Sequence, residues 1–118
     1  MKSINEMTDN ELRDLKYEMQ EIMNRRYVEH AVAVTVNNMV ATVEQREAAL
    51  KTLHEIRLEM WRRGYAAVPT ADRRDDYERH LERSVNRYEA AKASGDIVKM
   101  YDARARIEVN QDELDWIK

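Results

Sequence analysis

Three histidines, at positions 30, 54 and 80, could bind a metal or act in acid–base catalysis, beside 23 carboxylates that each suit a solvated helix surface. His54 and Glu55 begin the pattern H-E-x-x-H, which places two zinc ligands and a general base on one helix face, but Leu58 stands where the second histidine is required. The Glu-x-x-His pattern of di-iron proteins also fails, because the residue three positions before each histidine is a tyrosine or a lysine. We therefore expect no metal and no cofactor.

Signatures of nucleophilic catalysis and nucleotide binding are missing from the sequence as well. The serines stand at positions 3, 84 and 94, and none lies in a G-x-S-x-G turn. The chain has two glycines, Gly64 and Gly95, which are too few and too far apart for a glycine-rich phosphate loop. It has no cysteine, which excludes disulfides, thiolate metal sites and cysteine nucleophiles. We expect a protein that is not an enzyme.

Arginine supplies the basic residues that could contact a nucleic acid. Fourteen of the 20 basic residues are arginines, and Arg79, Arg83 and Arg87 recur every four residues, with Arg73 and Arg74 just before them. Such a row can follow a phosphate backbone. Five acidic residues interleave with it, however, so that residues 73–92 carry a net charge of only +1, which is typical of a solvated, salt-bridged helix face. Nucleic-acid binding by this face is therefore the alternative function.

A second set of candidate residues is apolar and would contact a protein. The last predicted helix carries one apolar stripe that suits packing on its own domain and a second stripe on the opposite side. A second stripe needs a second neighbour, either a partner or another part of the same fold. Outside this helix, two valines of the segment 31–44 and one leucine are candidates too. The predicted partner-binding residues are Val98, Tyr101, Ala105, Val109, Trp116, Val34, Val36 and Leu58.

The elements that position these residues are predicted to be mainly helices. Thr8 and Glu11 form a capping box that opens a helix over about residues 9–29. A second capping box spans Thr42 to Gln45 and opens a helix that runs to about Arg63, with Gly64 as the left-handed residue after it.

The stretch 31–44, "AVAVTVNNMVATVE", departs from the helical pattern. Val32, Val34 and Val36 alternate with small residues, and Asn37-Asn38 can form a two-residue turn, which favours a short β-hairpin. A continuous helix is the alternative, since apolar residues of the segment also fall near a helical period. An isolated two-stranded ribbon is barely stable in water, so the hairpin would have to pack on helices or on another chain.

The second half of the chain is predicted to form two more helices. Thr70 can cap a helix over about 71–93, whose inward face includes Val85, and Gly95 with Asp96 forms a tight turn into a helix over about 97–117. The predicted fold is thus a single, mainly α domain of residues 1–118. It has four principal helices in two antiparallel hairpins, with a short β-hairpin between helices 1 and 2.

Composition limits the class of protein further. The net charge of −3 lacks the basic excess of a dedicated duplex-DNA binder, and 36% charged residues with two glycines and one proline favour helices. No apolar run approaches the roughly 20 residues of a membrane span, and the N-terminus lacks a hydrophobic signal core. We expect a cytoplasmic, homo-oligomeric interaction module that binds another protein or itself. Its size and composition are typical of small accessory, regulatory or inhibitory factors of bacterial or phage type.

Overall fold

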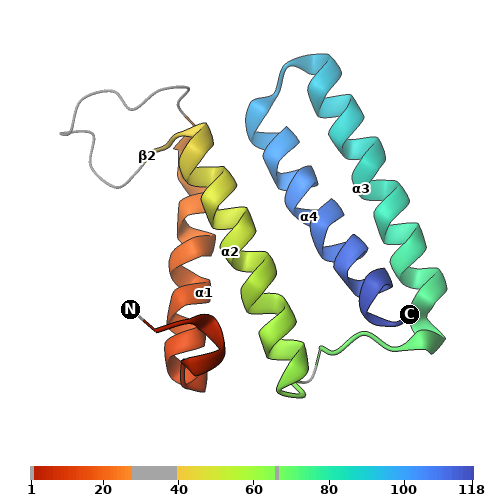
Figure 1. The fold of residues 1–118 in the computed structure, drawn as a ribbon. Helices are drawn as coiled ribbons and strands as arrows, with labels where there is room; N and C mark the ends of the chain where they lie inside the picture. The colour runs from red at the N-terminus through yellow and green to blue at the C-terminus, as the bar shows by residue number, and fades with distance from the viewer. Residues whose placement is uncertain (1, 28–39, 66) are drawn as a thin grey trace. The chain divides into compact units, whose positions relative to one another are not determined.

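The computed structural model describes residues 2–27, 40–65 and 67–118. Within them the chain is mainly helical, as predicted, with four α-helices: α1 (Asp9–Asn24), α2 (Val43–Arg62), α3 (Arg74–Ser94) and α4 (Ile97–Trp116) (Figure 1). Two 3-10 turns, η1 (Ile4–Glu6) and η2 (Ala71–Arg73), precede α1 and α3. The chain divides into two compact units, Met1–Met60 and Trp61–Lys118, which we describe separately. The grouping of residues 1–118 into a single domain stays a prediction.

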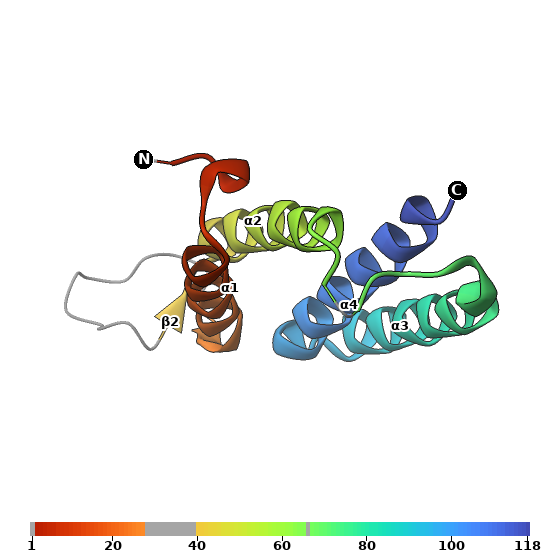
Figure 2. The ribbon, with the colours of Figure 1, turned by 90° about the horizontal axis from the view of Figure 1, so that it is seen from below.

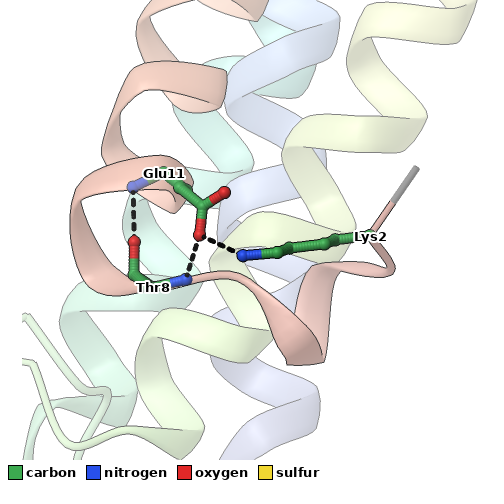
Figure 3. A network of polar contacts seen from close by, with 3 residues as sticks. All are labelled: Lys2, Thr8 and Glu11. Carbon is green, nitrogen blue, oxygen red and sulfur yellow. Dashed lines mark hydrogen bonds and ion pairs between the residues drawn. The ribbon is translucent and has the colours of Figure 1, made fainter.

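In the first unit, α1 begins at the predicted capping box. The Thr8 hydroxyl accepts a hydrogen bond from the Glu11 N–H at 3.2 Å, and the Glu11 carboxylate accepts one from the Thr8 N–H at 3.0 Å (Figure 3). Lys2 also reaches Glu11, with 3.0 Å between Nζ and Oε1. These bonds satisfy backbone donors that a helix start leaves unpaired, which fixes where α1 begins. Leu12 is fully buried on the inward face of the helix.

The end of α1 lies earlier than predicted, at Asn24 instead of about residue 29. The backbone becomes extended at Arg25, where ψ is 154°, and the side chain of Arg46 accounts for the stop. Its buried guanidinium donates to the carbonyl of Met23 at 2.8 Å and also to the carbonyl of Arg25. Carbonyls at a helix C-terminus have no partner within the helix, so the two arms of Arg46 cap α1 from a position 21 residues away.

The predicted β-hairpin is not confirmed. Two short strands, β1 (Arg26–Tyr27) and β2 (Val40–Ala41), pair in parallel, with Arg26 opposite Val40 and Tyr27 opposite Ala41. Residues 28–39, which include the alternating valines and the Asn37-Asn38 turn of the prediction, lie outside the described residues. The capping box of α2 is present: Thr42 and Gln45 exchange hydrogen bonds of 2.9 and 3.2 Å, so that Val43 is helical.

In the second unit, α3 and α4 lie side by side and run in opposite directions (Figure 1 and Figure 2). Gly95 joins them in the predicted left-handed conformation, with φ of 72°, and Asp96 accepts a hydrogen bond from the Lys99 N–H at 3.1 Å. The Thr70 cap is wrong, since no hydrogen bond of its side chain caps the helix and η2 intervenes before α3. The arrangement of all four helices as two antiparallel hairpins stays a prediction.

The contact between α3 and α4 contains a buried polar pair. The buried residues of α3 recur every seven positions, as Tyr77, Ser84 and Ala91. Ser84 donates a hydrogen bond to the side chain of Asn110 on α4, at 3.2 Å between Oγ and Oδ1. Val85, which the sequence places on the inward face, is 39% exposed, because the buried seam passes through its neighbour Ser84. None of the described helices is long and apolar enough to cross a membrane.

Candidate interaction surfaces

Helix α4 is buried on two opposite sides, in agreement with its two stripes in the sequence. Ala103 and Asn110 are buried on the side of α3, and Tyr101 and Asp112 are buried on the other side, about half a turn away. Tyr101 is only 7% exposed, so little of its surface is open to solvent.

Four other residues of the second stripe keep part of their surface exposed. They stand at intervals of seven, four and seven residues along one line of the helix, which we call the outer line of α4: Val98, Ala105, Val109 and Trp116. Val98 is 49% exposed and Trp116 is 37% exposed, while Ala105 and Val109 are half-buried. Residues at these intervals face the same direction on a helix, so the outer line is a continuous apolar row.

A pair of tryptophans holds one end of the outer line. The ring of Trp116 meets the ring of Trp61 edge to face, with centroids 5.5 Å apart and an interplanar angle of 63°. Trp61 itself is buried. Edge-to-face pairs of this geometry contribute roughly 0.5–1.5 kcal/mol beyond the area they bury. The contact therefore fixes the position of the Trp116 ring while leaving more than a third of that residue exposed. This pairing links residues 55 positions apart, and no local pattern in the sequence indicates it.

The other predicted partner-binding residues lie elsewhere. Leu58 is half-buried on α2, and Val34 and Val36 lie outside the described residues. The structure therefore groups four of the eight predicted partner-binding residues into one row, and it buries a fifth, Tyr101.

The first arginines of the alternative nucleic-acid face share one carboxylate. Arg79 donates to Asp76, and Arg73 lies 3.6 Å from the other oxygen of the same side chain. The hydrogen bond from Arg79, helped by Arg73, lowers the pKa of Asp76. Arg73 also stacks over the ring of Tyr77, with its guanidinium carbon 5.6 Å from the centroid. Asp76 thus neutralises part of the positive charge at the start of α3.

The remaining arginines of that face differ in their surroundings. Arg74 is half-buried, whereas Arg83 and Arg87 are exposed on successive turns of α3. Across residues 2–27, 40–65 and 67–118, neither of these two arginines forms an ion pair. Their guanidinium groups remain available to an external anion.

Metal ligands do not gather in the described part of the chain. No group of three or more His, Asp or Glu side chains in it is arranged to hold a metal ion. His54 is half-buried on α2 and His80 is exposed on α3, and they belong to different units. Two surfaces in the described residues carry binding residues predicted from the sequence, namely the outer line of α4 and the exposed arginines of α3.

Comparison with known proteins adds no relative to these observations. No protein-family model, no curated protein and no solved structure matches the chain. The function has to be inferred from the surfaces themselves.

Proposed function

We propose that this chain is a non-enzymatic interaction module that binds a protein helix, from a second copy of itself or from another protein, through the outer line of α4. The observation that carries the proposal is Trp116, which is 37% exposed although its ring is fixed edge-on against Trp61. Tryptophan is enriched among residues that dominate binding energy. A ring that is already immobilised loses less conformational entropy when a partner covers it.

The spacing of the outer line supports a helix as the partner. Val98, Ala105, Val109 and Trp116 follow the seven- and four-residue intervals of a heptad seam. Asp102 and Asp112 occupy the two remaining positions of that seam, Asp102 exposed and Asp112 buried. An apolar row interrupted by carboxylates favours a partner helix with apolar anchors and a basic residue near the level of Asp102.

The proposal extends to the wider role predicted from the sequence. The four helices would form two antiparallel hairpins, and the second hairpin, α3 with α4, would present the outer line. The module would act in the cytoplasm as an accessory, regulatory or inhibitory factor. These assignments rest on composition and on the absence of catalytic motifs in the sequence.

The proposal predicts that a charge placed on the outer line disrupts association. Sedimentation velocity over a range of protein concentrations would measure the mass of the wild type, Val98→Glu, Trp116→Ala and Val85→Glu. We expect the wild type to self-associate and both α4 variants to weaken that association at least tenfold. The glutamate introduced by Val98→Glu would lie in the first turn of α4, where an acidic side chain suits the helix dipole, so the fold should survive the change.

Val85→Glu is the matched control, because Val85 is also an exposed valine on a helix of the same unit but lies off the outer line. It should associate as the wild type does. A wild type that stays monomeric at every concentration contradicts self-association. Affinity capture with wild-type and Val98→Glu baits then tests a different protein partner, and equal capture by both baits would exclude the outer line as the binding surface.

A further inference from the structure

The exposed face of α3 carries two separate stripes of opposite charge. Along the sequence the charges alternate, but around the helix they segregate. On a helix with 3.6 residues per turn, the mean direction of the arginine side chains around the axis differs from that of the acidic side chains by about 110°. All members of both sets are exposed. The arginine stripe consists of Arg79, Arg83 and Arg87, and the acidic stripe consists of Asp75, Glu78, Glu82 and Glu89.

Around Arg83 and Arg87 the acidic stripe does not cancel the positive field, whereas Arg79 has Asp75 and Glu82 one helical turn away. At the outer radius of a helix, an angle of about 110° separates two groups by about 10 Å or more. The screening length at physiological ionic strength is about 8 Å. A ligand that contacts Arg83 and Arg87 is therefore shielded from most of the repulsion or attraction of the acidic stripe. The net charge of residues 73–92, summed along the sequence, does not reveal that the two kinds of charge lie on different sides of the helix.

Within the arginine stripe, the charges differ in availability. Arg79 is bound to Asp76, whereas Arg83 and Arg87 make no ion pair with any residue that the structure describes. The next arginine comes from α4. The Ser84–Asn110 hydrogen bond sets the register of the two antiparallel helices, so that Arg87 lies near the level of residue 107. At that level Arg106 is exposed on the same side of the helix pair as Arg87.

The residues between the two stripes argue against a protein as the ligand of this face. The exposed positions there are Asn86, Ala90 and Ala93, and none of them is a large apolar side chain. Protein interfaces depend on buried aromatic, aliphatic or arginine anchors surrounded by contacts that exclude water. Phosphate groups need no apolar anchor, because guanidinium groups bind their oxygens through paired, charge-assisted hydrogen bonds.

We propose that Arg79, Arg83, Arg87 and Arg106 bind the phosphate backbone of a nucleic acid without reading its bases. The three arginines of α3 are spaced by about 6 Å along the helix axis, so they can contact a series of phosphates along one strand. This surface is distinct from the outer line of α4, and the inference does not depend on the function proposed for that line. Neither tyrosine of α3 is exposed for base stacking, so binding rests mainly on charge.

The proposal is tested by fluorescence anisotropy with a labelled 20-nucleotide single strand and with its duplex, at 25–300 mM salt. If about three phosphates are neutralised, raising salt from 50 to 200 mM should weaken binding about 20-fold for the single strand and about 40-fold for the duplex. The two dissociation constants at one salt concentration show which form of backbone is preferred, and the slopes report how many phosphates are neutralised. Binding that does not depend on salt would overturn the proposal, as would no binding of either form at 25 mM salt.

Paired variants distinguish an effect of the arginine stripe on binding from an effect of the overall net charge. Arg83→Glu/Arg87→Glu should weaken binding at 50 mM salt by more than tenfold. Arg13→Glu/Lys51→Glu makes the same change in net charge at exposed positions of α1 and α2 and should change binding by less than twofold. Glu82→Gln/Glu89→Gln, which neutralises part of the acidic stripe, should tighten binding slightly. Far-UV circular dichroism would confirm that each variant is helical.

Two results from these variants would contradict the assignment. An equal loss of affinity in both charge-reversed variants would show that overall charge, and not the stripe, attracts the nucleic acid. Binding of a labelled polyglutamate peptide where neither oligonucleotide binds would show that the stripe recognises carboxylates on a protein instead of phosphates.

Discussion

At the scale of residues, the buried guanidinium of Arg46 ties the start of α2 to the end of α1. Its two donors occupy the carbonyls of Met23 and Arg25, which the helix itself leaves without partners. A long flexible side chain loses rotamer entropy when it is buried in this way, and two charge-assisted hydrogen bonds offset that loss. The planar, forked shape of arginine suits two acceptors at once.

Replacement of Arg46 is expected to destabilise the first unit. Arg46→Met fills similar space but leaves two buried carbonyls without donors, and we expect a loss of about 2–4 kcal/mol in the free energy of unfolding. Arg46→Lys should lose a comparable amount, because a single ammonium cannot reach both carbonyls. Urea denaturation would measure these changes. Arg13→Met, at an exposed position of α1, is the control and should lie within about 0.5 kcal/mol of the wild type.

At the scale of elements, the beginnings of the first two helices are fixed by short local motifs. Thr8 and Glu11 specify the start of α1, and Thr42 and Gln45 specify the start of α2. Both starts could be predicted from the sequence, because a capping box involves residues only three positions apart. The end of α1 could not be predicted, because the Arg46 contacts that stop the helix join distant parts of the chain.

The interaction surfaces, like the helix boundaries, could be predicted from the sequence only in part. A helical period identifies the residues that share a line on α4, and it reveals the row from Val98 to Trp116. The helical period does not show which residues of the second stripe are covered in the fold. Tyr101 and Val98 therefore look equivalent in the sequence, although Tyr101 is buried and Val98 is half exposed. On α3 the helical period predicted that Val85 faces inward. The structure instead buries its neighbour Ser84, which is small and hydrogen-bonded.

The start of α1 is expected to loosen in acid. Hydrogen bonds from the Thr8 backbone and from Lys2 lower the pKa of Glu11 from 4.5 to about 2. Because the folded state lowers this pKa, the contribution of Glu11 is complete above pH 4.5 and is lost as the pH falls through about 2. Amide hydrogen exchange at the first turn of α1 should therefore accelerate, relative to the intrinsic rate, across this window.

A pair of variants isolates the carboxylate in that experiment. Glu11→Gln keeps an acceptor for the Thr8 N–H but has no charge to lose, so exchange at the first turn should no longer respond to pH between 4.5 and 2. Glu18→Gln, on an exposed position further along α1, should leave the wild-type response intact. The interpretation fails if Glu11→Gln responds to acid as the wild type does.

At the scale of the whole molecule, the boundary between the two compact units falls inside a helix. The first unit ends at Met60 and the second begins at Trp61, and both residues belong to α2. The sequence-based prediction of a single domain implies that residues 1–118 unfold together.

Scanning calorimetry distinguishes one cooperative domain from two. A single domain should unfold in one transition whose calorimetric enthalpy equals its van't Hoff enthalpy. In that case Arg46→Met, a change in the first unit, should shift the whole transition to lower temperature. If only part of the heat absorption moves and a second peak stays at the wild-type temperature, the two units unfold independently and the chain consists of two domains.

The contact between Trp61 and Trp116 has an optical consequence. The chain contains two tryptophans, and both belong to this one contact. Intrinsic emission excited selectively at indole therefore originates at a single place, the end of the outer line of α4. Trp61 is buried and Trp116 is 37% exposed, so a collisional quencher reaches mainly Trp116. The protein thus carries an unlabelled reporter at the surface where we propose that its partner binds.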